Sequence, residues 1–202
     1  MTTQKKVLIA ILICLPVIYF VAFRVSSGKR YAPGIIVPTV PQQLKLEKPR
    51  VWRKGKYQFT ALAEFNLKAR VLSTETYWFD EGADISPVDF ALGWGIMSDQ
   101  KVLDELSISQ TGRWYYWNSS GEPPISPEEI TAFSSNMHII PKTDAVNTLI
   151  KRVGKGDIIE LRGFLVEITR DDGFTWKSSL SRTDTGAGAC EVVLVEEIYI
   201  NK

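Results

Sequence analysis

The chain opens with its longest unbroken apolar run. Residues 7–23 read VLIAILICLPVIYFVAF, with Lys5 and Lys6 before the run and Arg24 after it. A helix of about 17 residues, rising roughly 1.5 Å per residue, is just long enough to cross a hydrocarbon core. The run also has no polar face of the kind that a globular helix turns to water. The sequence therefore predicts a transmembrane helix over 7–23.

An uncleaved signal-anchor is the interpretation we favour for this helix. A cleaved signal peptide would have a shorter apolar core, and Arg24 interrupts the approach to the one cut site, before Gly28, that Val25 and Ser27 would offer. Basic residues flank the run on both sides, so the positive-inside comparison is nearly balanced. The short leader favours a single-pass inner-membrane protein with an extracytoplasmic domain. A cytoplasm-facing domain is the alternative.

Sustained alternation of apolar and polar residues follows between Tyr57 and Leu72. A period of two over this length predicts a long, half-buried and bent strand. Later in the chain, the apolar and β-branched stretches 157–169 and 190–200 also predict strands. Gly163 is expected to mark a bulge or barrel corner, and Asp171 to Gly173 a hairpin turn. Residues 192–195 are apolar on both faces, which predicts a central strand.

Helices are predicted where capping residues precede short apolar patterns. The expected starts are Ser86, Ser98, Ser126 and Thr143, and proline follows two of the serines directly. The fold class is therefore α+β: a strongly curved, mostly antiparallel sheet or small barrel with three to four short helices. The stretch GDIIELRGFLVEI at 156–168 resembles a strand of oligonucleotide/oligosaccharide-binding (OB) barrels, which makes an OB-like form one option.

Charge divides the chain into segments. Residues 24–56 contain nine basic residues and one acid, Glu47, whereas 57–202 contain 13 basic residues and 22 acids. The prolines at 33, 38, 41 and 49 indicate an extended spacer or an edge strand in the first of these segments. We expect a tail at 1–6, the membrane helix at 7–23, a basic juxtamembrane linker at 24–56 and a globular domain at 57–202. The basic linker suits anionic lipid headgroups, and the acidic domain argues against nucleic acid.

Few side chains suggest catalysis. His138 is the only histidine, and Cys190 is the only cysteine outside the membrane helix. A Cys-His pair on a membrane-anchored β-barrel resembles the sortase transpeptidases, which implies a hydrolase or transpeptidase. Sortases also place an arginine after the cysteine, and no arginine follows Cys190 here. A buried thiol and an isolated histidine are the structural alternative.

A loop of small residues after Trp176 is the candidate ligand site. Ser179, Arg182 and Asp184 lie in it, followed by Gly186 and Gly188. Such a loop can direct backbone N–H groups and an arginine at an anion or sugar, with Trp176 as a stacking face. A glycine-rich connection that satisfies its own backbone is the alternative. No metal-ligand spacing occurs, so we expect no metal and no cofactor.

The block from Gly156 through WKSSLSRTDTGAGACE, at 176–191, resembles single-span bacterial membrane proteins to which we attach no activity. This resemblance implies a bacterial envelope setting. The sequence as a whole predicts a non-enzymatic membrane-anchored envelope protein whose α+β domain binds a protein or glycan. The alternatives are a Cys190–His138 enzyme and a cytoplasm-facing accessory subunit of a membrane complex.

Overall fold

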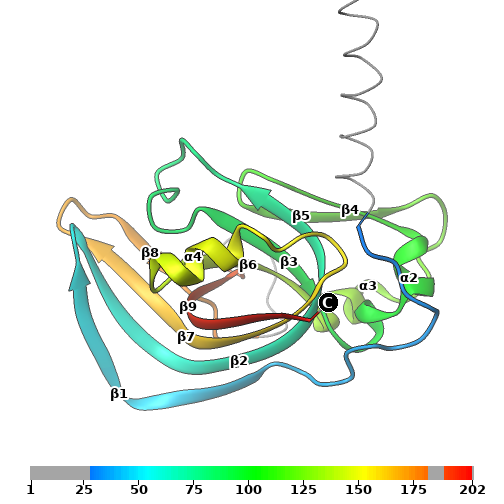
Figure 1. Cartoon of the computed structure of the whole chain (residues 1–202), viewed down its shortest axis with the longest axis horizontal. Helices are drawn as coiled ribbons and strands as arrows, with labels where there is room; N and C mark the ends of the chain where they lie inside the picture. The colour runs from blue at the N-terminus through cyan, green and yellow to red at the C-terminus, as the bar shows by residue number, and fades with distance from the viewer. Residues whose placement is uncertain (1–27, 182–188, 202) are drawn as a thin grey trace, which may run out of the picture.

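Strand β2 (Tyr57–Thr76) organises the fold. The computed structural model describes residues 28–181 and 189–201, which form a mixed α+β, strand-rich structure around a curled sheet (Figure 1). The other strands are β1 (Gln42–Lys54), β3 (Val88–Gly93), β4 (Leu106–Thr111), β5 (Trp114–Ser119), β6 (Ser134–Pro141), β7 (Ile158–Arg170), β8 (Thr175–Lys177) and β9 (Glu191–Asn201). The helices are the 3-10 helix η1 (Gly95–Ser98), α2 (Gln100–Asp104), α3 (Pro127–Phe133) and α4 (Asp144–Ile150).

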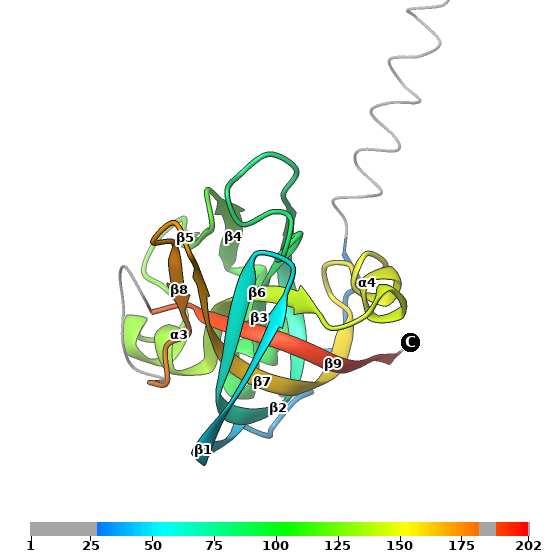
Figure 2. The same cartoon turned by 90° about the vertical axis from the view of Figure 1, so that its left-hand side faces the viewer.

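Five strands pair in a closed circuit, which Figure 2 shows from the side. Strand β2 pairs with β3, β3 with β6, β6 with β9, β9 with β7, and β7 returns to β2. Only the β6–β9 pairing is parallel among these described strands. Strand β9 is therefore flanked on both sides, as its doubly apolar segment 192–195 predicts.

Strand β2 contributes apolar side chains to two separate hydrophobic clusters. Its odd-numbered residues from Tyr57 to Val71 are buried, and its even-numbered residues from Gln58 to Lys68 are more exposed. Phe65, Leu67 and Val71 face the core inside the circuit. Tyr57 and Phe59, earlier on the strand, belong to a second apolar cluster with the outer surfaces of β6, β7 and β9. The bend in β2 lets the same alternation supply both clusters.

Gly163 marks a bulge, as the sequence predicts. The β7–β9 register shifts between Arg162 and Gly163, and the Gly163 Cα lies directly against the carbonyl of Leu194. A side chain at residue 163 would collide with that backbone. Because glycine has no Cβ, β7 can approach β9 and curl at this point.

Two predicted helices form with their predicted caps. Ser126 and Glu129 make a reciprocal capping box at α3, and the Thr143 hydroxyl accepts from the Val146 N–H at α4. The helix predicted from Ser86 is wrong: residues 88–93 are the buried strand β3. Alternate residues of this strand pack into two different clusters, which outweighs the local capping signal.

Residues 28–56 belong to the fold instead of forming a spacer. Of the two sequence alternatives, the edge strand is the one that occurs, because β1 pairs with β2 from Gln42 to Lys54. Before it, Val37 is fully buried, and the backbone N–H groups of Ile36 and Val37 both donate to the Ser98 hydroxyl. Only residues 24–27 then separate the apolar run from the described domain.

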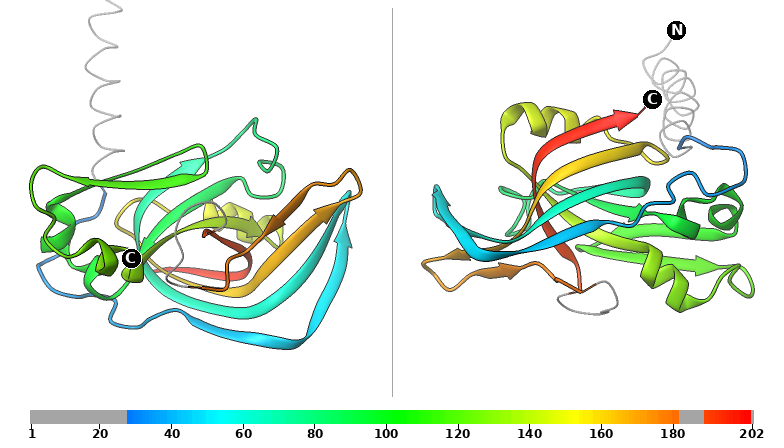
Figure 3. Two further views of the ribbon diagram at one scale, coloured as in Figure 1. Left: turned by 180° about the vertical axis from the view of Figure 1, so that it is seen from behind. Right: turned by 90° about the horizontal axis from the view of Figure 1, so that it is seen from below.

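The predicted membrane helix lies outside the described residues. Among residues 28–181 and 189–201, no helix has the length and apolarity needed to span a bilayer. Figure 3 shows the described domain from behind and from below, with the β4–β5 hairpin beside the curled sheet.

Candidate functional site

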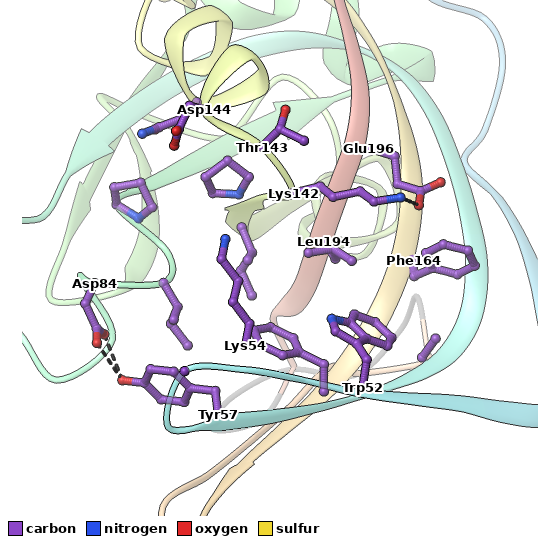
Figure 4. Close-up of a pocket in the computed structure, with 18 of the residues that line it drawn as sticks. Trp52, Lys54, Tyr57, Asp84, Lys142, Thr143, Asp144, Phe164, Leu194 and Glu196 are labelled. Carbon is purple, nitrogen blue, oxygen red and sulfur yellow. Dashed lines mark hydrogen bonds and ion pairs between the residues drawn. The ribbon is translucent and has the colours of Figure 1, made fainter.

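An open groove of about 810 Å³ lies between the β1–β2 hairpin, helix α4 and the outer face of β9 (Figure 4). Its floor is apolar and aromatic, and its rim is charged. The floor residues are Trp52, Tyr57, Phe59, Ile140, Phe164 and Leu194, and the charged rim residues are Arg50, Lys54, Lys56, Asp84, Lys142, Asp144 and Glu196.

The aromatic floor follows from strand register. Trp52 on β1 is the direct cross-strand partner of Phe59 on β2. Their rings stack with centroids 5.4 Å apart and planes 9° from parallel. The Arg50 guanidinium lies 5.4 Å from the centroid of the Phe164 ring. Cross-strand aromatic pairs stabilise a hairpin, so these contacts fix the floor before any ligand arrives.

Much of the rim is neutralised by internal pairs. Lys142 lies 2.6 Å from Glu196, and Lys56 lies 3.1 Å from Asp84. The Tyr57 hydroxyl donates to Asp84 at 2.8 Å, and the hydrogen bond with Asp84 raises the pKa of Lys56. Lys54 has no ion pair among the described residues, so its ammonium remains available to a ligand.

A second polar cluster lies on the outer face of β3 and β6. Asp89 is fully buried, and its Oδ1 accepts from Nη1 of Arg113 at 2.8 Å. Its Oδ2 lies 2.9 Å from Nδ1 of His138, although neither atom makes a well-oriented hydrogen bond. The β3–β6 register places Asp89 directly opposite His138, so this histidine has a carboxylate neighbour.

Arg113 joins this cluster to the loop between β2 and β3. Its guanidinium holds both oxygens of Asp80, at 2.6 and 2.8 Å, and lies 3.6 Å from the centre of the Tyr77 ring. The hydrogen bond from Arg113 lowers the pKa of Asp80, and burial raises the pKa of Tyr77. Arg113 sits in the β4–β5 turn with φ 72°, a conformation that is uncommon outside glycine.

The sheet brings Cys190, which directly precedes β9, close to the strand that carries His138. His138 pairs with Val192 in the parallel β6–β9 ladder, so Cys190 lies beside Asn136, two residues along. The Asn136 amide donates to the Cys190 sulfur at 3.8 Å. No hydrogen bond joins His138 to Cys190 in the part of the chain that is described.

The candidate ligand loop is described only in part. Trp176 packs on the His138 ring, with centroids 4.7 Å apart, and lies against Gly82, so contacts within the protein occupy its ring. Ser179 is buried, and its backbone N–H donates to the Cys190 carbonyl. Arg182 and Asp184 lie outside the described residues.

Sequence reasoning missed the groove and the Arg113 cluster for different reasons. The groove needs Trp52 opposite Phe59, and β1 shows no sustained alternation that would predict its register. One feature of the sequence could have indicated the cluster. Only Gly112 and Arg113 lie between two short strands, and two residues is the length of a tight hairpin turn.

The described residues contain no group of His, Cys, Asp and Glu side chains that could hold a metal ion. Comparison of the chain with protein-family models, with curated proteins and with solved structures finds no match.

Proposed function

We propose that this chain is a membrane-anchored binding protein of the bacterial envelope, non-enzymatic, whose groove holds a segment of a partner protein. The observation that carries this is the groove of about 810 Å³ with an aromatic floor. Ligand sites are typically clefts of about 300–1,000 Å³, lined by apolar and aromatic side chains with a few polar groups at the edge.

The rim indicates the chemistry of the ligand. Within residues 28–181 and 189–201, Lys54 has no ion pair, and the ionic partner of Arg50 is Glu64, at 3.9 Å. An apolar side chain next to a carboxylate fits such a floor and rim. A glycan fits less well, because Phe59 covers one face of Trp52 and four of the rim groups pair with one another, as Lys142 with Glu196 and Lys56 with Asp84. We therefore favour a peptide segment over a glycan.

The barrel topology supports the groove as the binding surface. The five-strand circuit is consistent with an OB-type barrel, and such barrels bind nucleic acids and sugars on the face of their second and third strands. Strands β3 and β6 hold those positions here. Arg113 covers Asp89 on this face, Gln110 donates to Asn136 at 2.6 Å, and Trp176 covers His138. The groove is the surface left open.

The groove can be tested with 8-anilinonaphthalene-1-sulfonate, which combines an aromatic body with one anionic group. The full chain in detergent should enhance its fluorescence. Trp52→Ala should weaken the affinity roughly tenfold, equivalent to about 1.4 kcal/mol of lost apolar contact. Lys54→Ala should weaken it less and reduce its salt dependence. Leu44→Ala, an exposed β1 change outside the groove, is the matched control.

Competition then distinguishes the ligand classes. Short peptides with an apolar residue beside a carboxylate should displace the dye, whereas neutral oligosaccharides should not. If Trp52→Ala leaves dye affinity equal to that of the control, the groove is not the binding site. Displacement by oligosaccharides alone would assign the groove to a glycan.

The membrane location is tested separately. The C-terminally tagged protein in spheroplasts should be digested by added protease, because the proposal places the domain outside the cytoplasm. A cytoplasmic marker verifies that the inner membrane is intact. Protection of the tag would reverse the topology and favour an accessory subunit that faces the cytoplasm.

A Cys190 enzyme is the second candidate, and one observation favours it. The Asp89 carboxylate lies 2.9 Å from Nδ1 of His138, which resembles a base with its orienting group. If His138 activates Cys190, the thiol should react with iodoacetamide well below its ordinary pKa of about 8.5, and His138→Gln should abolish this. Equal reactivity in the two proteins would exclude the thiolate pair.

A further inference from the structure

The loop between β2 and β3 presents two large aromatic side chains to solvent. The exposed fraction is 73% for Trp78 and 100% for Phe79. In Figures 1 and 2 this loop rises above the rest of the described fold. Adjacent bare aromatic residues on one projecting loop are a feature of interaction surfaces and of membrane-interface segments.

The loop is held in place by the β4–β5 turn. Arg113 binds Asp80 through two hydrogen bonds, and the Arg113 backbone N–H donates to the Tyr77 hydroxyl at 3.0 Å. Trp114 and Tyr116, on the adjoining strand β5, are 42% and 49% exposed and project from the same face of the hairpin. We call Trp78 and Phe79 the aromatic face.

Charge around the loop does not oppose contact with lipid. Its acids all have cationic partners: Asp80 pairs with Arg113, Glu81 with Arg170 and Asp84 with Lys56, at 2.6, 2.6 and 3.1 Å. A depression of about 350 Å³ beside Trp78 and Phe79 is lined by Lys151. Lys151 has no ion pair among the described residues, so its ammonium can meet a lipid phosphate.

The chain before the domain limits how far this face can be from a bilayer. Residues 24–27 alone connect the apolar run that ends at Phe23 to Gly28, and five peptide steps extend at most about 18 Å. Lys29 is tied to the domain by its ion pair with Asp157 and its backbone bond to Lys155. The start of the coloured ribbon lies on the same side of the domain as the β2–β3 loop (Figures 1 and 2).

We infer that the aromatic face inserts Trp78 and Phe79 into the headgroup and upper acyl region of the bilayer that anchors residues 7–23. The anchor and the loop then form two contacts with one membrane. Together they fix the orientation of the domain relative to the bilayer, with β1 on the side of the domain away from the inserted loop (Figure 1). This inference rests on the proposed membrane anchor.

The experiment uses the full chain reconstituted in phosphatidylcholine vesicles, with and without brominated acyl chains. Bromine quenches only tryptophan close to lipid. The quenched part of the emission should be lost in Trp78→Phe and kept in Trp52→Phe, because Trp52 is stacked in the groove. Both side chains are replaced by another aromatic ring, and Trp78 is exposed, so Trp78→Phe should fold normally.

Vesicle flotation separates the two proposals. A chain that does not float with vesicles contradicts the membrane anchor itself. A chain that floats but shows the same bromine quenching in wild type, Trp78→Phe and Trp52→Phe overturns the aromatic-face inference alone, and would assign Trp78 and Phe79 to a protein partner. Quenching that persists in Trp52→Phe and disappears in Trp78→Phe supports the inference.

Discussion

Asp89 and Arg113 form an ion pair that joins the barrel to the β4–β5 hairpin. Oδ1 of Asp89 lies 2.8 Å from Nη1 of Arg113, and the carboxylate is fully buried. The same arginine holds the loop that carries Trp78 and Phe79, through Asp80. One buried pair therefore connects the stability of the fold to the position of its most exposed aromatic residues.

Asp89→Asn should lower the free energy of unfolding by about 3–5 kcal/mol, because it leaves the half-buried Arg113 without its deepest counter-charge. Urea denaturation of the detergent-solubilised chain measures this. Asp171→Asn is the matched control: Asp171 pairs with Arg53 at 2.9 Å in solvent, and such a pair contributes at most about 1 kcal/mol. Equal losses in the two variants would contradict the buried-pair interpretation.

Gly163→Ala should destabilise the fold by about 1–3 kcal/mol or more, since the added methyl group meets the Leu194 carbonyl and forces β7 away from β9. Gly121→Ala is the control, because nothing lies near its Cβ position. Thermal unfolding of both variants compares the two sites. A Gly163 variant as stable as the Gly121 variant would show that β7 can relax around a side chain.

Ser98→Ala should release the segment before β1. The Ser98 hydroxyl accepts from the N–H groups of Ile36 and Val37 and donates to the Gly95 carbonyl at 2.7 Å. Its loss leaves the partly buried Ile36 N–H and the buried Val37 N–H without this acceptor, and an unpaired buried N–H costs about 1–3 kcal/mol. Trypsin should then cut faster after Lys29 and Arg30 than in wild type. Ser119→Ala, which removes an exposed bond to Gly121, should leave this rate unchanged.

Acid should weaken the fold partly through Asp80. The hydrogen bond from Arg113 lowers the pKa of Asp80 below its ordinary 3.8. The folded state then binds the proton less tightly than the unfolded state, so this stabilisation is present above the ordinary pKa and is lost as pH falls through the folded value. The urea midpoint of Asp80→Asn should depend less on pH below about 4 than that of wild type. Identical pH profiles would exclude this contribution.

Local patterns predicted the elements that carry strong repeating signals. The alternation along 57–72 identified β2, and Ser126 and Thr143 identified two helix starts. The Ser86 signal failed because capping preference contributes about 1 kcal/mol at most sites, whereas burying β3 on both faces contributes more. The edge strand β1 was only one of two alternatives, because its pairing with β2 is set by contacts far along the chain.

Taken alone, the sequence determined the apolar run at 7–23, the α+β class, the curled sheet and its Gly163 bulge, since period, capping and glycine act within a few residues. Only the tertiary structure decided what lies together. It placed Trp52 over Phe59, His138 beside Asp89, Arg113 between barrel and loop, and residues 28–41 along the domain. These contacts join residues that are distant in the chain. Strand register and burial determine such contacts, and a local sequence pattern predicts neither.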